Sequence, residues 1–255
     1  ELADQYLEAL TRRNPAGLPL SESIRFTENG RELQLGEGLW STAGPLNSYR
    51  AYVVDSDSKA VAVQAVLKED SAVVQLLVRL QLDETTITEI ETLVAREGDT
   101  CCWDPERLDS LSPIFGEAVP TSERANREAL IAVADAYFTA LHTAGTPGYG
   151  HVELADGVNR YENGLQTTNV IDGNPITRRD AETQLDSALF GRISVEHRRY
   201  QVVDTQNGTL LGIVVFEYPN STRPSEVISE FFKVADGRIQ EIRAVMAKTP
   251  VTGWD

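Results

Sequence analysis

The chain has 255 residues, with 39 acidic against 23 basic side chains and a formal net charge of −16. A surface of this sign repels nucleic acid phosphates, so we expect no nucleic acid partner. No apolar run reaches the roughly 18 residues of a transmembrane helix, so no membrane partner is expected either. The only cysteines, Cys101 and Cys102, are adjacent and give no disulfide framework, which favours a reducing, cytoplasmic location; a leader removed ahead of Glu1 would also fit.

The first half begins with a predicted helix over residues 1–13, because Leu2, Tyr6 and Leu10 recur on one helical face. A short strand over 23–26 follows, and it leads into the turn Glu28-Asn29-Gly30. Four further strands are predicted at 49–55, 59–67, 72–82 and 86–95.

The middle of the chain, residues 97–122, is predicted to be a linker. It contains prolines, charged residues and the Cys101-Cys102 pair, and it shows no regular apolar period. Catalytic use of these cysteines is not expected, because no histidine lies near them in the sequence.

The second half repeats the order of elements. A helix is predicted over 123–143, a short strand over 157–161 and an additional helix over 178–188. Four strands are then predicted at 194–204, 209–218, 226–235 and 238–247.

Several short motifs occur once in each half. Ala3-Asp4-Gln5-Tyr6 is matched by Ala134-Asp135-Ala136-Tyr137, and Glu28-Asn29-Gly30 by Glu162-Asn163-Gly164. A spacing of about 130 residues is too long for a solenoid repeat, so two whole domains are expected, at 1–96 and 123–255. One helix followed by an antiparallel sheet in each half predicts an α+β fold.

This pattern resembles the SnoaL-like proteins of the ketosteroid isomerase and scytalone dehydratase superfamily. The resemblance implies two tandem cone-shaped α+β barrels, each a curved sheet around its first helix, and chemistry without a cofactor. It places Tyr6 and Tyr137 where that isomerase stabilises an oxyanion, and Glu28 and Glu162 where it has its general base. A second acid of the oxyanion hole would fall near Ser229 or Glu230, whereas the equivalent position of the first half has no carboxylate and lies near Arg79.

The parity of the short strands supports these positions. Ile24, Phe26 and Glu28 point to one side of their strand, so Glu28 is expected in an apolar pocket that raises its pKa; the alternative is a solvated turn residue. Arg160 and Glu162 likewise share a face and are expected to form an ion pair, whether structural or catalytic.

Other residues complete the predicted sites. Phe26, Trp40, Tyr161 and Glu230 are expected to line ligand pockets. His151 and His197 are candidates for dehydratase chemistry, with a structural role as the alternative. The three histidines have no recognised metal-site spacing, so no metal is predicted.

Three functions remain open on this basis. The first is a cofactor-independent isomerase, dehydratase or other lyase acting on a small, largely apolar molecule. The second is an epoxide hydrolase or cyclase that uses Arg160 and Glu162, and the third is a ligand-binding protein without catalysis. The two halves are expected to pack together as a pseudo-dimer, and a further homodimer is compatible with the pattern.

Overall fold

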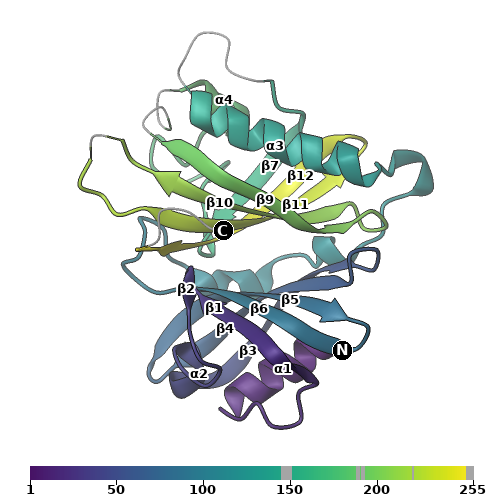
Figure 1. The fold of residues 1–255 in the computed structure, drawn as a ribbon. Coiled ribbons are helices and arrows are strands. Elements are labelled where there is room, and N and C mark those ends of the chain that lie inside the picture. Colours follow the sequence, from purple (N-terminus) through teal and green to yellow (C-terminus); the bar gives the residue numbers. More distant parts are fainter. Residues whose placement is uncertain (145–150, 188–189, 191–192, 220, 251–255) are drawn as a thin grey trace.

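The protein is described from a computed structural model that covers residues 1–144, 151–187, 190, 193–219 and 221–250. Figure 1 shows two stacked halves, whose sheets meet in the middle while the helices lie at the two outer ends. Among the described residues, no helix has the length and apolar character needed to cross a membrane.

The two halves have the same elements in the same order. The first comprises α1 (Leu2–Thr11), β1 (Leu20–Glu28), β2 (Arg31–Glu32), α2 (Leu39–Thr42), β3 (Ala43–Asp55), β4 (Ala60–Glu69), β5 (Ala72–Asp83) and β6 (Thr86–Ala95). The second comprises α3 (Arg127–Thr143), β7 (Leu154–Glu162), β8 (Leu165–Gln166), α4 (Ala181–Asp186), β9 (Ser194–Asp204), β10 (Thr209–Glu217), β11 (Glu226–Ala235) and β12 (Arg238–Lys248). Three short 3-10 helices connect the halves: η1 (Pro105–Ser110), η2 (Ile114–Gly116) and η3 (Thr121–Glu123).

The two sheets also share one topology. Within the described residues, each half forms a six-stranded sheet, ordered β2-β1-β6-β5-β4-β3 in the first half and β8-β7-β12-β11-β10-β9 in the second. In both sheets the first strand of the half pairs in parallel with the last, β1 with β6 and β7 with β12. The other pairings are antiparallel. The predicted fold class, two tandem α+β cones, is confirmed.

Each helix packs its apolar face into the concave side of its own sheet. Tyr6 and Leu10 of α1 are buried in the first cone, and Tyr137 and Leu141 of α3 are buried in the second. The spacing of four residues in each pair is the helical period that the sequence shows. Helix α3 starts later than predicted, at Arg127, because Asn126 caps it by accepting a hydrogen bond from the Ala129 N–H at 2.9 Å.

The repeated Asn-Gly turns have a structural cause. Asn29 exchanges two hydrogen bonds with the backbone of Val94 (3.0 and 2.7 Å), and Asn163 exchanges two with Met246 (3.0 and 2.8 Å). Both asparagines adopt positive φ, 48° and 45°, which asparagine tolerates better than most residues. The amide thus continues the sheet past the end of the short strand, and it fixes the glutamate that precedes it.

The convex faces of the two sheets form a third core between the halves. Side chains of both sheets and of the connecting segment contribute, including Val53, Leu77, Phe115, Leu211 and Phe231. A buried ion pair also crosses this layer, since Glu91 on β6 accepts from Arg199 on β9 at 2.6 Å. The halves are therefore packed through a continuous apolar layer with specific polar contacts.

The segment that follows each sheet packs on the Asn-Gly turn of the other half. After β6, Thr100 accepts a hydrogen bond from Asn163 at 3.0 Å. After β12, the Thr249 hydroxyl donates to the carbonyl of Asn29 at 3.0 Å. The two halves are thus joined reciprocally at the ends of their short strands.

Candidate active site

Strand β7 directs two charged side chains into the second cone. Val158, Arg160 and Glu162 alternate with residues of the convex face, and Val158 belongs to the cone's apolar core. Arg160 Nε lies 2.8 Å from Glu162 Oε1, which confirms the predicted ion pair. The side chains are 3% and 15% exposed, so the pair is largely withdrawn from water.

Arg160 is held by side chains of α3, of α4 and of the segment after β8. Its Nε donates to Thr167 Oγ1 at 3.1 Å, its Nη1 to the Tyr137 hydroxyl at 3.4 Å, and its Nη2 to Gln184 Oε1. The Gln184 amide in turn donates to the Thr167 carbonyl at 2.6 Å. These contacts fix the guanidinium, and through it the carboxylate of Glu162.

Glu230 adds a second carboxyl group to this cluster from β11. Its neighbours along the strand, Ile228 and Phe232, belong to the core of the second cone, so Glu230 points inward. Burial raises the pKa of Glu230 to about 8; Arg160 opposes the rise, and Glu162 adds to it. Glu230 Oε2 is buried and has no hydrogen-bond partner among the described residues.

Tyr137 of α3 faces the same cluster. Its ring packs edge-on against Phe138 and Phe232, with centroids 5.7 and 5.4 Å away. Burial, with the nearby Glu230 carboxyl, raises the pKa of the phenol, so the hydroxyl stays protonated at neutral pH. The cluster therefore contains an ion-paired carboxylate, a carboxyl group that keeps its proton near neutral pH, and a phenol.

The equivalent region of the first cone is apolar. Phe26 stands two residues before Glu28, where Arg160 stands before Glu162, and it pairs with Ile90 as Arg160 pairs with Ile242. Val78 pairs with Thr92, the partner of Glu28, as Glu230 pairs with Ala244, the partner of Glu162. Arg79, the nearest charged residue in the sequence, ion-pairs with Glu91 instead.

Trp40 fills the first cone beside Tyr6. The two rings meet edge to face at 5.4 Å, and the indole N–H donates to the Tyr6 hydroxyl at 3.1 Å. Trp40 is 1% exposed and Tyr6 is fully buried. The tryptophan predicted to line a ligand pocket is therefore a core side chain that satisfies Tyr6, and Phe26 packs in the same core.

Glu28 is buried, as the strand parity predicts, but its partner is the backbone. Its Oε2 accepts from the Leu39 N–H at 2.8 Å, and Arg96 Nη2 lies 3.7 Å from Oε1. The pKa of Glu28 is raised, chiefly by burial. Gly38 is required at this contact, since it has φ 61° and a Cβ atom there would lie 2.5 Å from Oε2.

Three predicted site residues lie elsewhere. His151 is exposed and contacts Glu153, while His197 is exposed on β9, so neither faces a cone. Tyr161 alternates with Arg160 and Glu162, and it therefore lies on the opposite face of β7. A single histidine in the sequence shows no periodic pattern from which its position could be predicted. For Tyr161, strand alternation already predicts the face opposite to Glu162.

Thr167, Gln184 and the cysteine pair are neighbours of the site that the sequence did not predict. Gln184 lies on the predicted extra helix beside the apolar Ala181 and Leu185, which was an available signal. Cys102 donates a hydrogen bond to Glu162 Oε2 at 3.3 Å across a sequence separation of 60 residues. Nothing local in the sequence announces that contact.

The second half matches a known family model. The model of a domain of unknown function, DUF8021, matches residues 123–246, so it spans the second cone and neither the first cone nor the cysteine pair. No curated protein matches the chain.

Solved structures with some similarity to this chain include a steroid delta-isomerase from Pseudomonas aeruginosa, a protein from Sphaerobacter thermophilus and AclR, a proposed hydroxylase from Streptomyces galilaeus. Their sequence identities are 13%, 16% and 14%, and all three have a TM-score of 0.30. The matches cover 38%, 38% and 48% of this chain and 78%, 94% and 87% of the respective structures. A TM-score of 0.30 is too low to support a statement about function.

Proposed function

We propose that the second cone catalyses proton transfer on a small, mainly apolar molecule that carries one oxygen function. The reaction would be an isomerisation, dehydration or other elimination without a cofactor. The observation that supports it best is the inward-facing cluster of Arg160, Glu162 and Glu230. In this cluster one buried carboxyl oxygen has no hydrogen-bond partner in the part of the chain that the structure describes. Buried polar atoms are normally satisfied, so a substrate oxygen is a suitable partner for Glu230.

In this proposal Glu162 is the general base and removes a proton from carbon. The electron pair moves into the substrate, and negative charge develops on its oxygen. In an isomerisation, protonated Glu162 then returns the proton to another carbon; in an elimination, the charge collapses as the leaving group departs, and protonated Glu162 gives its proton to that group. Tyr137 and protonated Glu230 donate hydrogen bonds to that oxygen, and such donors are most effective in a site withdrawn from water. Arg160 is a positioning residue, because it holds Glu162 through Oε1 at 2.8 Å.

A second function is favoured by one specific feature of the cluster. Arg160 interacts electrostatically with two carboxyl groups. It forms an ion pair with Glu162, and its charge also acts on Glu230, whose pKa is raised. A carboxylate that activates water and a carboxylic acid that protonates the opening oxygen would together hydrolyse an epoxide to a diol. The two functions differ in their products, since only the hydrolysis incorporates oxygen from labelled water.

The test is to incubate the purified chain with a panel of small apolar unsaturated ketones, hydroxy ketones and epoxides, and to follow the products by mass spectrometry in labelled water. We expect turnover in one class, with a loss of at least about a hundredfold in Glu162→Gln. Glu28→Gln is the matched control, because Glu28 occupies the same position in the apolar cone. Equal turnover in wild type and Glu162→Gln would contradict the proposal, and binding without turnover would favour a ligand-binding protein.

A further inference from the structure

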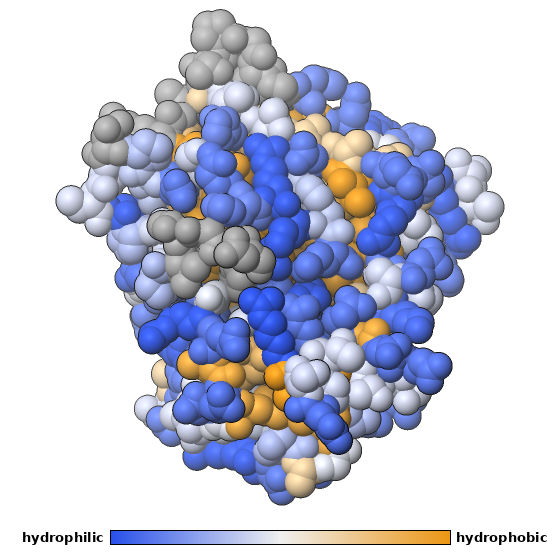
Figure 2. Space-filling model, in the orientation of Figure 1, coloured by the Kyte–Doolittle hydropathy of each residue, from blue (hydrophilic) through white to orange (hydrophobic). Residues whose placement is uncertain are grey.

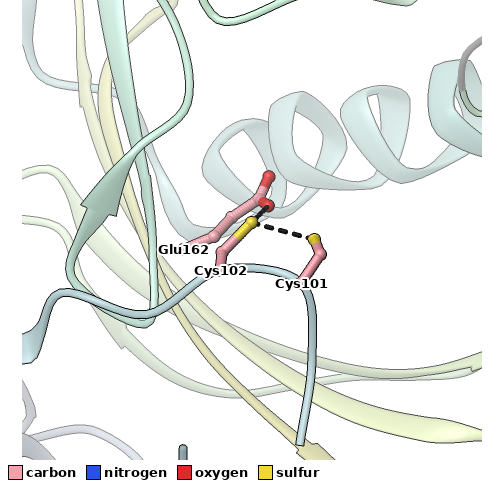
Figure 3. A group of neighbouring side chains, drawn as sticks. All are labelled: Cys101, Cys102 and Glu162. Atoms are coloured by element: carbon pink, nitrogen blue, oxygen red, sulfur yellow. Dashed lines mark hydrogen bonds between the residues drawn. The ribbon is translucent and has the colours of Figure 1, made fainter. Parts of the chain in front are cut away.

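The linker brings two sulfur atoms against the carboxylate of Glu162. Figure 3 shows Cys101 and Cys102 on the loop that passes the end of β7, with the Cys102 thiol directed at Glu162. The two Sγ atoms are 2.9 Å apart, and one ligand atom from each of the three residues lies within 4.8 Å of the other two. Cys102 is buried, whereas Cys101 is exposed, so the cluster can be reached from solvent.

This approach is fixed by the backbone around it. The Asp104 N–H donates to the Asn163 carbonyl at 2.9 Å, and the Asn163 amide donates to Thr100 Oγ1 at 3.0 Å. Gly164 makes the close passage of the linker tolerable, because a Cβ atom there would lie 2.1 Å from the Asp104 carbonyl oxygen. The cysteines are thus anchored on both sides to the turn that carries Glu162.

The geometry suits a shared ligand better than a disulfide. The Cα atoms of adjacent residues are about 3.8 Å apart, and disulfides usually need at least about 4.4 Å. In a tetrahedral zinc site with Zn–S bonds of about 2.3 Å, the two sulfurs are about 3.8 Å apart. The two Sγ atoms, now 2.9 Å apart, would therefore have to separate by about 0.9 Å. Rotation of the exposed Cys101 side chain can supply that separation without moving Cys102.

We propose that Cys101, Cys102 and Glu162 bind one thiophilic divalent cation of the zinc class, with a fourth position open to water. Two thiolates and a carboxylate are ligands that zinc accepts in protein sites. Glu162 offers Oε2, because Arg160 lies on Oε1. This site joins the linker to the second cone, since the linker provides its sulfurs and Glu162 at the end of β7 its oxygen.

The local charges balance when the cation is bound. Two thiolates and one carboxylate carry three negative charges, and the cation together with the Arg160 guanidinium offsets them. Arg160 would not bind the cation itself. It would hold the ligating carboxylate of Glu162 in position through Oε1, as residues around metal ligands commonly do. Binding releases protons from the two thiols, so affinity rises with pH.

A bound cation would also occupy the oxygen that faces the cysteines and so restrain Glu162. This consequence rests on the proposed function, and it predicts that the cation inhibits proton transfer. Cation binding itself does not depend on the reaction. If the cation binds and turnover is unchanged, the binding site stands and Glu162 is not the base.

The experiment uses the full chain, reduced and stripped with a chelator, and titrated with Co²⁺ as a spectroscopic probe and Zn²⁺ as competitor. We expect one Co²⁺ per chain, a thiolate-to-cobalt charge-transfer band, and its loss on addition of Zn²⁺. Cys102→Ser should weaken the band and the affinity together. Glu162→Gln should keep the band and weaken the affinity at least about tenfold, since even outer-partner changes cost that much.

Glu28→Gln is the matched control and should bind as wild type does, because the first cone places no cysteine near Glu28. Thermal unfolding without metal checks that every variant is folded; if Cys102→Ser is not, Cys101→Ser takes its place. Absence of the band in wild type at millimolar Co²⁺, or equal affinity in wild type and Glu162→Gln, would overturn the proposal.

Discussion

The two cones carry the same helix tyrosine and the same strand-end glutamate, and they surround them with opposite chemistry. In the first, Phe26, Val78 and Trp40 pack around Tyr6, and Glu28 binds a backbone N–H. In the second, Arg160 and Glu230 occupy the positions of Phe26 and Val78. Two cones of one topology can thus share a framework while a few inward positions decide which of them is polar inside.

Figure 2 shows a face that is largely hydrophilic, with hydrophobic residues visible between the polar ones in both halves. The residues that distinguish the two cones, Phe26 and Val78 against Arg160 and Glu230, are all buried and so do not contribute to this surface.

Truncation of Trp40, which fills the core of the first cone, should have the largest effect on stability. Trp40→Ala creates a cavity and leaves the Tyr6 hydroxyl without its donor, so we expect a loss of about 3–5 kcal/mol in the free energy of unfolding. Urea denaturation measures it. Trp40→Phe keeps most of the ring volume and should cost much less. Equal costs for both variants would show that the stabilisation comes from the indole N–H bond to Tyr6 and not from the volume of the ring.

Exchange of the glutamates should separate the cones by activity. Glu162→Gln removes the proposed base and is expected to lower kcat at least about a hundredfold, or about 2.7 kcal/mol. Glu28→Gln should stay within about twofold of wild type. Steady-state kinetics on the substrate found by screening decides the matter, and the opposite ranking would move the active site to the first cone.

Exchange of Glu230 on β11 for the valine found at the equivalent position of the first cone should change stability and function in opposite directions. Glu230→Val, which installs the residue of the first cone, removes a buried unsatisfied carboxyl group and should stabilise the fold by about 1–3 kcal/mol. It should also lower turnover. Val78→Glu should destabilise by at least a similar amount. Both are measured by urea denaturation, and a destabilised Glu230→Val would mean that Glu230 has a strong partner.

The pH dependence of stability should report the raised pKa of Glu230. Its pKa rises from 4.5 in a free chain to about 8 in the fold, so the folded state keeps a proton that the unfolded chain loses in this range. The contribution of Glu230 is fully present below about pH 4.5 and declines as pH rises towards 8, by about 1.4 kcal/mol per unit. Arg160, Glu162, Tyr137 and Tyr200 face this group.

Urea denaturation of wild type and Glu230→Gln across this range isolates the contribution, because glutamine does not titrate. A difference between the two that is independent of pH would show that Glu230 is ionised in the fold.

Periodicity and parity in the sequence predicted much of this. Helical spacing found Tyr6 and Tyr137, and strand alternation put Glu28 and Glu162 on the inner faces and paired Arg160 with Glu162. Those inferences are local, and the local backbone decides them. Trp40 as filler and Cys102 beside Glu162 depend on how distant segments pack, and no short pattern encodes that.

The reciprocal joining of the halves has a consequence for dissecting the molecule. A fragment of residues 123–246, the stretch that the DUF8021 model spans, would contain Arg160, Glu162, Glu230 and Tyr137. It would lack Thr100, which accepts from Asn163, and the Asp104 backbone, which lies against Gly164. The turn next to Glu162, the proposed base, would then be open to water. The fragment that contains all the proposed site residues is therefore shorter than the one needed to hold Glu162 in position.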